Sequence, residues 1–347
     1  MPTAIITGIT GQDGAYLAKF LLSKGYDVYG TFRRVSTPNF WRLQSLGIFD
    51  DIHLIPADLI DLSSLIEAIR LSSPDEIYNL AAQSFVGASF TMPIGTGLIT
   101  GIGVAKILEA VRQTDKTIRF YQASTSELFG NASDKVQNEN TPFCPQSPYA
   151  AAKLYGHWMV EIYRDAYDMF ACCGILFNHE SPLRGLEFVT RKISNVTAKI
   201  KLGLQNALTL GNIKSKRDWG YAPEYVESMW LMLQQEAPAD YVIATNETHS
   251  VKEFAEIAFE YLDISIDRLK IDEELFRPLD VPYLQGDYSK ANTKMNWRPK
   301  TLFKDLVKIM VDSDLKNWTR WLNGERFPWD APNYPTELSI LTETKKI

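Results

Sequence analysis

Cysteine is scarce in this chain, which has 347 residues and only three cysteines. Cys172 and Cys173 are adjacent within an apolar run and Cys144 stands apart, so the sequence offers no framework of paired cysteines. Such sparing use of cysteine favours buried thiols in a reducing compartment over a disulfide-stabilised secreted domain.

The chain also lacks an excess of positive charge, a long apolar run and room for a leader segment. Its net charge is −6 and no block of lysine and arginine occurs, which argues against a nucleic-acid-binding surface. No apolar run approaches the roughly 20 residues of a membrane span, and the first residues enter a strand pattern directly. We expect a soluble cytoplasmic protein that binds neither nucleic acid nor membrane, and we expect no metal site.

Apolar runs typical of strands alternate with helical patterns through the first half of the chain. The predicted strands cover residues 4–7, 27–32, 52–57, 76–82, 118–124 and 171–177. Alternation of this kind, with unbroken apolar strands, predicts an α/β fold with a doubly wound, Rossmann-type parallel sheet covered on both faces. Ligands of such sheets bind beyond the carboxyl ends of the strands.

After about residue 177 the pattern changes, because short strands mix with helices and proline-marked turns. We predict a Rossmann domain over residues 1–176 and a smaller C-terminal α/β substrate-binding domain over 177–347, with segments near 209–245 returning in part to the first. The last twenty residues, from Pro328, carry three prolines and few apolar pairs, which leaves an ordered tail and a loose end both open.

The most informative motif is TGITGQDG, at residues 7–14, which joins the first strand pattern to a helical pattern. Gly8, Gly11 and Gly14 let a phosphate approach bare backbone at a helix N-terminus, where N–H groups and the helix dipole favour negative charge. The first two glycines are three residues apart rather than two, so a tight turn without a ligand is the alternative. We expect this loop, with Thr10, Gln12 and Asp13, to bind a dinucleotide.

The end of the second strand distinguishes the two nicotinamide dinucleotides. NAD usually meets a carboxylate there, whereas the 2′-phosphate of NADP needs cations. This chain offers Arg33 and Arg34 and no carboxylate, so NADP is favoured over the alternative of two solvated arginines. Further expected cofactor contacts follow later strands: Asp58, which can accept a hydrogen bond from the adenine amino group, Leu59, Leu80, Ala81, Ala82 and Ser84.

Tyr149 and Lys153 stand four residues apart in a strong helical pattern, so their side chains share one helix face. An ammonium beside a phenol lowers the pKa of the phenol and suits a base that removes a hydroxyl proton. With 16 tyrosines in the chain, about one such pair is expected by chance. The value of this pair is its place, at the start of the helix after the fifth predicted strand.

The segment QASTSELFG closes that fifth strand and contains Thr125 and Glu127. If the two residues stay extended, they face the same side. A threonine hydroxyl can steady a sugar oxygen or the phenol, and a carboxylate can act as an acid or a base. A surface glutamate after a strand is the alternative for this segment alone. The glycine turn, the Tyr–Lys pair and this pair together predict one catalytic pocket.

These residues together resemble the extended short-chain dehydrogenase/reductase superfamily and, within it, the GDP-mannose 4,6-dehydratase family. The matching stretches run from Ala4 to about Asp312. Among them, FYQASTSELFG and FNHESP are specific to this family, whereas the glycine turn and the Tyr–Lys pair occur across the superfamily.

The resemblance implies an NADP-dependent lyase that converts GDP-mannose to GDP-4-keto-6-deoxymannose. Tyr149, helped by Lys153, would take the proton of the 4-hydroxyl while a hydride leaves C4. Glu127 would then remove the C5 proton as water leaves C6, and the hydride would return to C6. The family also implies a homodimer or homotetramer.

The same resemblance assigns nucleotide contacts. Asn178 is expected to meet the substrate diphosphate, and His179 and Arg184 to lie near the cofactor. The other expected substrate contacts are Ser84, Lys192, Arg217, Arg277 and Asp280. For any one of these cations taken singly, a solvated charge is the better explanation.

Some residues depart from the family pattern. Leu98, Ile99 and Thr100 stand where an acidic residue, valine and Asp are usual, and Leu183 replaces a second arginine. Asp280 stands where Glu is usual. A GDP-manno-heptose is therefore an alternative substrate.

Two further classes of function stay open from the sequence. A nucleotide-sugar epimerase or reductase would use the same fold without a C5 base. A non-catalytic dinucleotide-sensing or scaffold protein would not need the four residues Thr125, Glu127, Tyr149 and Lys153 together.

Overall fold

A seven-stranded parallel sheet forms the centre of the computed structural model, which describes residues 1–36 and 39–325. The order β11-β6-β5-β4-β1-β2-β3 reverses direction between β1 and β4, the switch point at which such sheets bind ligands. The strands are β1 (Thr3–Thr7), β2 (Asp27–Phe32), β3 (His53–Pro56), β4 (Glu76–Asn79), β5 (Arg119–Ala123), β6 (Ala171–Leu176) and β11 (Tyr241–Ile243). The predicted Rossmann-type α/β fold is confirmed. The fourth strand ends at Asn79, and residues 80–82 form a loop instead of continuing it.

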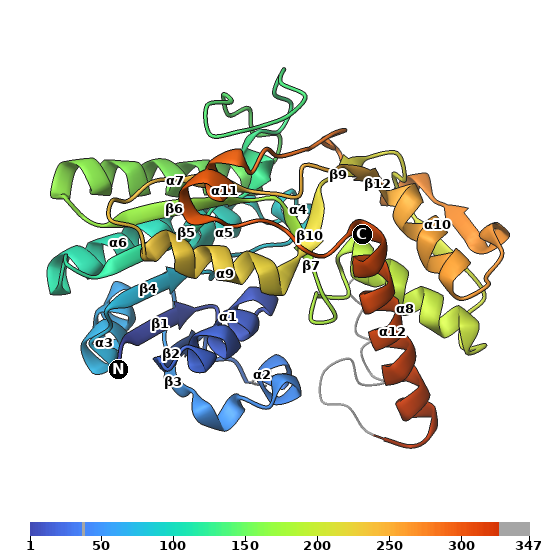
Figure 1. The fold of residues 1–347 in the computed structure, drawn as a ribbon, viewed down its shortest axis with the longest axis horizontal. Helices are drawn as coiled ribbons and strands as arrows, with labels where there is room; N and C mark the ends of the chain where they lie inside the picture. Colours follow the sequence, from blue (N-terminus) through green and yellow to red (C-terminus); the bar gives the residue numbers. More distant parts are fainter. Residues whose placement is uncertain (37–38, 326–347) are drawn as a thin grey trace.

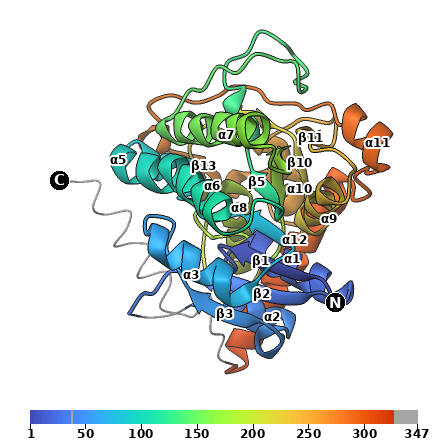
Figure 2. The ribbon, with the colours of Figure 1, turned by 90° about the vertical axis from the view of Figure 1, so that its left-hand side faces the viewer.

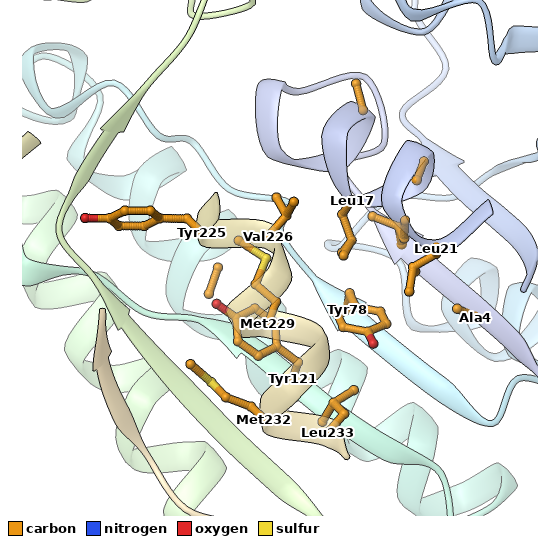
Figure 3. Packing of buried hydrophobic residues seen from close by; sticks show 14 of the residues in the cluster. Ala4, Leu17, Leu21, Tyr78, Tyr121, Tyr225, Val226, Met229, Met232 and Leu233 are labelled. Carbon is orange, nitrogen blue, oxygen red and sulfur yellow. The ribbon is translucent and has the colours of Figure 1, made fainter. Parts of the chain in front are cut away.

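Helices cover both faces of the sheet, as Figure 2 shows. One face carries α1 (Gln12–Ser23), α2 (Trp41–Leu46) and α9 (Ala222–Leu233), and the other α3 (Leu62–Ser72), α6 (Gly103–Thr114) and α7 (Pro148–Tyr167). Figure 3 shows Leu21 of α1 and Met229 of α9 packed with Tyr78 and Tyr121 of the sheet. Because both faces are buried, the strands read as continuous apolar runs rather than as alternating ones.

A second group of helices lies beside the sheet, on the right of Figure 1. It comprises α8 (Val189–Lys201), α10 (Val251–Tyr261) and α12 (Phe303–Leu322), which share an apolar core with β8 (Leu208–Leu210) and β13 (Leu269–Ile271). Its interior holds an ion pair between Arg191 of α8 and Asp314 of α12, 2.7 Å apart and each 1% exposed. Pairs this deeply buried are costly to break singly, so they fix how α8 and α12 pack.

Short strands connect the two parts of the molecule. β7 (Asn178–Glu180) pairs with β10 (Trp219–Tyr221), and β9 (Lys216–Arg217) pairs with β12 (His249–Ser250). Within the segment 209–245, α9 and β11 pack on the main sheet, whereas β8 pairs with β13. The domain boundary at residue 176 stays a prediction, and the tail from Pro328 lies outside the described residues.

The helix before the fifth strand corrects one expectation. Residues Pro93–Thr114 form one run of α5 (Pro93–Thr96), a π-helix η2 (Gly97–Ile102) and α6, and in the described part of the chain this run is long and apolar enough to cross a membrane by length and composition. The expectation that no such run exists is therefore wrong. Half of its apolar window is buried, against α3 and α7, as in core helices that meet the same criteria.

Close packing of this helix fixes the position of α7. A Cβ on Gly101 of η2 would lie 3.2 Å from the carbonyl of Ala152, and one on Gly156 would lie 2.9 Å from Val104. Contacts this short exclude larger side chains, so the glycines let α7 approach η2 and α6 closely.

Candidate functional site

A chain of buried hydrogen bonds runs along the carboxyl ends of β1, β4 and β5. Thr7 Oγ1 donates to Asn79 Oδ1 at 2.6 Å, and Asn79 Nδ2 donates to Gln122 Oε1 at 2.7 Å. Gln122 Nε2 and Lys153 Nζ both donate to the carbonyl of Ala123, at 3.0 and 2.7 Å. This series of hydrogen bonds therefore connects the switch point of the sheet to the first turns of α7.

The glycine turn lies directly above the start of this chain. Gly8 has a φ of 71°, and a Cβ there would lie 2.9 Å from Ala81. A Cβ on Gly14 would lie 2.5 Å from the carbonyl oxygen of Gly8, whereas Gly11 begins α1 with no side-chain cap. The turn thus holds α1 close to the sheet and presents backbone at the helix N-terminus, as a diphosphate site requires.

The loop after β4 packs against this turn. The backbone N–H groups of Leu80 and Ala81 both donate to Thr7 Oγ1 at 3.1 Å, and Ser84 at the end of the loop is exposed. Beyond β3, Asp58 is partly exposed, and the neighbouring Leu59 is buried against α6 near Gly103. The structure thus gathers these sequence-predicted residues and Ala82 at the carboxyl edge of the sheet.

Arg33 and Arg34 follow β2 directly and are exposed. Neither forms an ion pair with any residue in the described part of the chain, and no carboxylate closes β2. Together with the uncapped α1 and the side-chain-free glycine turn, these residues fit a bound dinucleotide.

Tyr149 lies in the first turn of α7, which Ser147 caps by accepting a hydrogen bond from the N–H of Ala150 at 3.1 Å. Its side chain is 7% exposed. Burial raises the pKa of the Tyr149 phenol, a hydrogen bond with Thr125 lowers it and the charge of Glu127 raises it. The phenol, the threonine and the glutamate thus interact at one place.

Lys153 stands one turn further along α7, with Nζ 5.8 Å from the centre of the Tyr149 ring. Burial lowers the pKa of Lys153 to about 8, and its ammonium faces the carbonyl of Ala123. The pKa of the Tyr149 phenol is raised overall because burial outweighs the hydrogen bond with Thr125, and the lowering effect of Lys153 stays a prediction.

The backbone of Thr125 and Glu127 differs from the extended form considered above. Thr125 is extended, but it caps the short 3₁₀ helix η3 (Ser126–Leu128), which contains Glu127. Thr125 Oγ1 accepts a hydrogen bond from the N–H of Glu127 at 3.3 Å. The side chains therefore meet the phenol through a turn rather than through strand alternation.

The first turn of α1 is bonded to β7. Asp13 Oδ2 lies 2.8 Å from His179 Nε2, and His179 Nδ1 lies 2.7 Å from the carbonyl oxygen of Phe177. Gln12 Nε2 donates to the carbonyl of His179 at 3.1 Å, and Gln12 Oε1 accepts from Ser181 at 2.7 Å. The glycine turn and the expected substrate segment thus form one rigid unit.

The charges of this pair stabilise each other. Burial alone would raise the pKa of Asp13, but the charge and hydrogen bond of His179 bring it down to about 2. Burial would lower the pKa of His179, and the charge and hydrogen bond of Asp13 raise it instead. The geometry suits a carboxylate and an imidazolium.

Two arginines hold the loop that carries Arg184. Arg42 of α2 donates to the carbonyls of Leu183 and Thr10, at 2.7 and 3.0 Å, and so bridges this loop to the glycine turn. Arg191 donates to the carbonyls of Pro182 and Arg184, at 2.6 and 2.9 Å. Arg184 itself lies over the Phe188 ring at 3.6 Å.

Part of the expected substrate set converges. Arg217 donates to Asp280 at 3.3 Å, and Arg277 lies 4.0 Å from the same carboxylate. Asp280 also accepts from Ser215 and Asn212 at 2.6 and 2.9 Å. This cluster of Arg217, Arg277 and Asp280 has the paired guanidinium groups that suit phosphate recognition.

Two expected substrate residues lie apart from the cluster of Arg217, Arg277 and Asp280. Asn178 begins β7, opposite Trp219 of β10, and Lys192 lies in the first turn of α8. Burial lowers the pKa of Lys192, and the charge of Asp272 opposes this. No ion pair joins either residue to the cluster within residues 1–36 and 39–325.

Two departures from the family pattern have structural roles. Thr100 Oγ1 accepts a hydrogen bond from the N–H of Gln83 at 3.1 Å, so a neutral side chain orders the loop after β4. Leu183 is buried, and its carbonyl accepts a hydrogen bond from Arg42.

Four residues of the site were not predicted from the sequence: Thr7, Asn79, Gln122 and Arg42. For the first three, the available signal was a polar residue at the end of an apolar strand.

The sheet, the glycine turn and the Tyr149–Lys153 pair define a class of protein: a Rossmann-type nucleotide-binding fold with a Tyr–Lys pair at the carboxyl edge of its sheet. Among solved structures, dTDP-glucose 4,6-dehydratase from Bacillus anthracis, in complex with NAD, has a TM-score of 0.81 at 18% identity and covers 94% of this chain and 100% of its own. RMD from Pseudomonas aeruginosa, complexed with NADPH, has a TM-score of 0.75 at 20% identity and covers 91% and 100%. These likenesses show the fold.

Comparison with known sequences identifies a narrower group of proteins than the shared fold does. The family described as GDP-mannose 4,6 dehydratase matches residues 5–310. GDP-mannose 4,6 dehydratase of Drosophila melanogaster is 50% identical over 339 residues, covering 90% of this chain and 86% of the relative. The human protein of that name is 47% identical over 339 residues and covers 90% and 91%. The chain belongs to the GDP-mannose 4,6-dehydratase family.

The Asp13–His179 pair generates a pH-dependent prediction. His179 has a raised pKa in the folded protein, so its contribution to stability is complete below pH 6.5, the pKa of the unfolded chain, and is lost as pH rises through the folded pKa. Asp13 contributes fully above pH 3.8, its pKa in the unfolded chain, and its contribution is lost as pH falls through its folded pKa of about 2. Asp13→Asn should therefore lower the free energy of unfolding most between pH 3.8 and pH 6.5, by about 2 kcal/mol, and less at pH 9.

Urea unfolding of both proteins across this pH range measures the difference. Asp27→Asn is the matched control, because Asp27 pairs with the exposed His53 at 3.0 Å and surface pairs contribute little. A loss in Asp13→Asn that is the same at pH 5 and pH 9, or no larger than in the control, would contradict the account.

Proposed function

We propose that this protein is an NADP-dependent GDP-mannose 4,6-dehydratase, which yields GDP-4-keto-6-deoxymannose. One arrangement carries the proposal within the family: Tyr149 stands in the first turn of α7, one turn before Lys153, and its phenol is paired with Thr125, which caps the turn that carries Glu127. A base for a hydroxyl proton and a second carboxylate base at one place are what oxidation at C4 followed by elimination across C5 and C6 requires.

Each of these side chains has a proposed role. Tyr149 accepts the proton of the sugar 4-hydroxyl, and Thr125 donates a hydrogen bond to the phenolate and steadies the 4-oxygen. Lys153, whose pKa burial lowers to about 8, holds the polar edge of the sheet and relays the proton. Once C4 is a ketone, the C5 proton is acidified, and Glu127 removes it and passes it to the C6 hydroxyl, which leaves as water. When hydride returns to C6, C5 takes up one proton, which balances the proton that Tyr149 took from the 4-hydroxyl.

The residues around the glycine turn would hold the cofactor. Gly8, Gly11 and Gly14 receive its diphosphate, Arg33 and Arg34 its 2′-phosphate, and Asp58 its adenine. The nicotinamide of bound NADP supplies the hydride acceptor for C4 and the hydride donor for C6. His179 and Arg184 close the cofactor side of the pocket from β7 and the loop that follows.

The GDP group is assigned to the second part of the molecule. Arg217 and Arg277 flank Asp280 and suit phosphate and ribose, and Lys192 and Asn178 lie on the segments between this cluster and the Tyr149 region. The sugar would then reach from the cluster toward the phenol. GDP-manno-heptose is the second candidate substrate, because Leu98, Ile99, Thr100, Leu183 and Asp280 together depart from the family pattern.

Activity of catalytic variants tests the central proposal. Glu127→Gln should lower turnover of GDP-mannose by roughly 100-fold or more, because the C5 proton loses its base, and Tyr149→Phe by at least as much. Product mass spectra from a panel of GDP-linked and other nucleotide-linked hexoses and heptoses measure this. Glu260→Gln, at an exposed position of α10, is the control. If Glu127→Gln retained turnover, Glu127 would have no catalytic role. Consumption of NADPH added to the assay would favour a reductase. If the wild type turned over no nucleotide sugar, a dinucleotide-sensing protein would be favoured.

Cofactor preference is a separate prediction. The wild type should bind NADP at least tenfold more tightly than NAD, because charge-assisted hydrogen bonds to a phosphate contribute about 1.5–3 kcal/mol each. The double substitution Arg33→Ala and Arg34→Ala should abolish most of this preference. Arg70→Ala, at an exposed position of α3, should leave the preference unchanged. Titration calorimetry with both dinucleotides decides, and equal or tighter NAD binding by the wild type would contradict the assignment.

We also propose self-association through adjacent helices. Ile94, Leu98 and Ile102 are exposed and four residues apart, and Tyr155 and Ile162 are exposed on neighbouring α7. Residues at this spacing share one helix face, so they form an apolar surface across two packed helices. The family homodimer or homotetramer would bury it.

The association state checks this surface. The wild type should sediment as a dimer or tetramer, and Leu98→Glu with Ile162→Glu as a smaller species, because buried charges oppose assembly. Leu71→Glu changes an equally exposed leucine on α3 and should leave the assembly intact. A monomeric wild type, or an unchanged double variant, would refute the surface.

A further inference from the structure

A cavity of about 640 Å³ lies beside α7, away from the Tyr149 pocket. Its walls come from the loop 139–143, from His157 and Glu161 of α7, and from residues 238–240 before β11. Tyr149 and Lys153 do not line it, so the function proposed above makes no use of this space. The cavity has a mixed polar and apolar lining and is large enough for a ligand.

His157 is the most unusual group in the wall. It is 2% exposed, and its Nδ1 lies 3.2 Å from Ser124 Oγ. Its Nε2 is nearest Glu161 Oε1, at 3.7 Å, which is beyond hydrogen-bond distance. A buried imidazole with one nitrogen fixed by a hydroxyl and the other directed at a carboxylate has the arrangement of a metal-ligating histidine.

Two carboxylates complete the set. Glu161 follows His157 by four residues on the same helix face, and Asp240 comes from the adjacent strand end. One donor atom from each of the three residues lies within 4.8 Å of the others. Donors of a tetrahedral zinc ion stand roughly 3.3–3.6 Å apart, given bonds of about 2.0–2.2 Å, so binding would draw the three donor atoms closer together.

Asp240 keeps a free position for a cation. Its Oδ1 accepts from Arg164 Nη2 and from the N–H of Cys173, at 2.5 and 2.6 Å, whereas Oδ2 accepts only from Arg164 Nη1, at 3.1 Å, among the described residues. A carboxylate oxygen can accept more than one such bond. Arg164 therefore orients Asp240 without occupying Oδ2 fully.

The charges of the cavity favour a cation overall. Glu139, Glu161, Asp240, Arg164 and Lys290 all line it; Arg164 binds the carboxylate of Asp240, and Lys290 donates to the backbone carbonyl of Asp240 at 2.7 Å. The three carboxylate side chains outnumber the two cationic side chains by one. A divalent ion would reverse this small excess and satisfy His157 and Glu161 together.

We propose that His157, Glu161 and Asp240 bind a divalent transition-metal ion of the zinc class. One imidazole and two carboxylates are ligands of borderline softness, which suit Zn²⁺ and Co²⁺, with water in the remaining positions. The bound ion holds Nε2 of His157 and leaves the Nδ1 proton for Ser124, which directly precedes Thr125. The proposed site differs from the sequence expectation of no metal and is independent of the proposed dehydratase activity.

Metal binding to the purified full chain tests the site directly. After chelator treatment, equilibrium dialysis against Zn²⁺ should show one tight ion per chain, and Co²⁺ should give visible absorption bands typical of nitrogen and oxygen ligands. Glu161→Gln should weaken binding at least tenfold, and His157→Gln should abolish it. Zn²⁺ should also raise the unfolding temperature of the wild type but not that of Glu161→Gln.

The matched control is His249→Gln, because His249 is partly exposed, lies 3.5 Å from Glu247 and belongs to no group of three possible ligands among the described residues. It should bind Zn²⁺ as the wild type does. Glu161 is half-exposed, so its variant keeps the test valid if His157→Gln does not fold. No stoichiometric binding by the wild type, equal binding by Glu161→Gln, or loss of binding in His249→Gln would each overturn the proposal.

Discussion

The site depends on one continuous chain of hydrogen bonds along the carboxyl edge of the sheet. It begins at Thr7, passes through Asn79 and Gln122, and ends where Lys153 meets the carbonyl of Ala123. Every member is buried, so each donor that lost its partner would carry a desolvation cost of about 1–3 kcal/mol. This series of hydrogen bonds therefore fixes the position of α7 relative to the glycine turn, and so sets the distance between that turn and the Tyr–Lys pair.

The second part of the molecule is attached to this edge by charged groups. Asp13 and His179 join α1 to β7, while Arg42 bridges the glycine turn to the loop that Arg191 also holds. A displacement of that loop would break bonds on both sides of the pocket at once. The expected cofactor and substrate residues therefore share one framework, which suits a reaction that oxidises and later reduces the same sugar.

The fold could be predicted from the sequence because each strand is an unbroken apolar run and the glycine turn opens a helix. The Tyr–Lys pair followed from helical spacing together with its place at the start of the helix after the fifth predicted strand. The turn at Glu127 did not, since one extended residue before a 3₁₀ helix leaves no periodic signal. The partners of Asp13 and Asp240 were equally hidden, because they lie 166 and 76 residues away in the chain and meet only through packing.

The central claim is that one pocket oxidises C4 and reduces C6 of the same sugar. Single-turnover reaction of GDP-[4-²H]mannose, mixed with an equal amount of a ¹³C-labelled, undeuterated substrate, tests it most directly by mass spectrometry. The account predicts deuterium at C6 of the same molecules that lost it from C4, with none transferred to the ¹³C product. Deuterium released to water, or found on the ¹³C product, would contradict it.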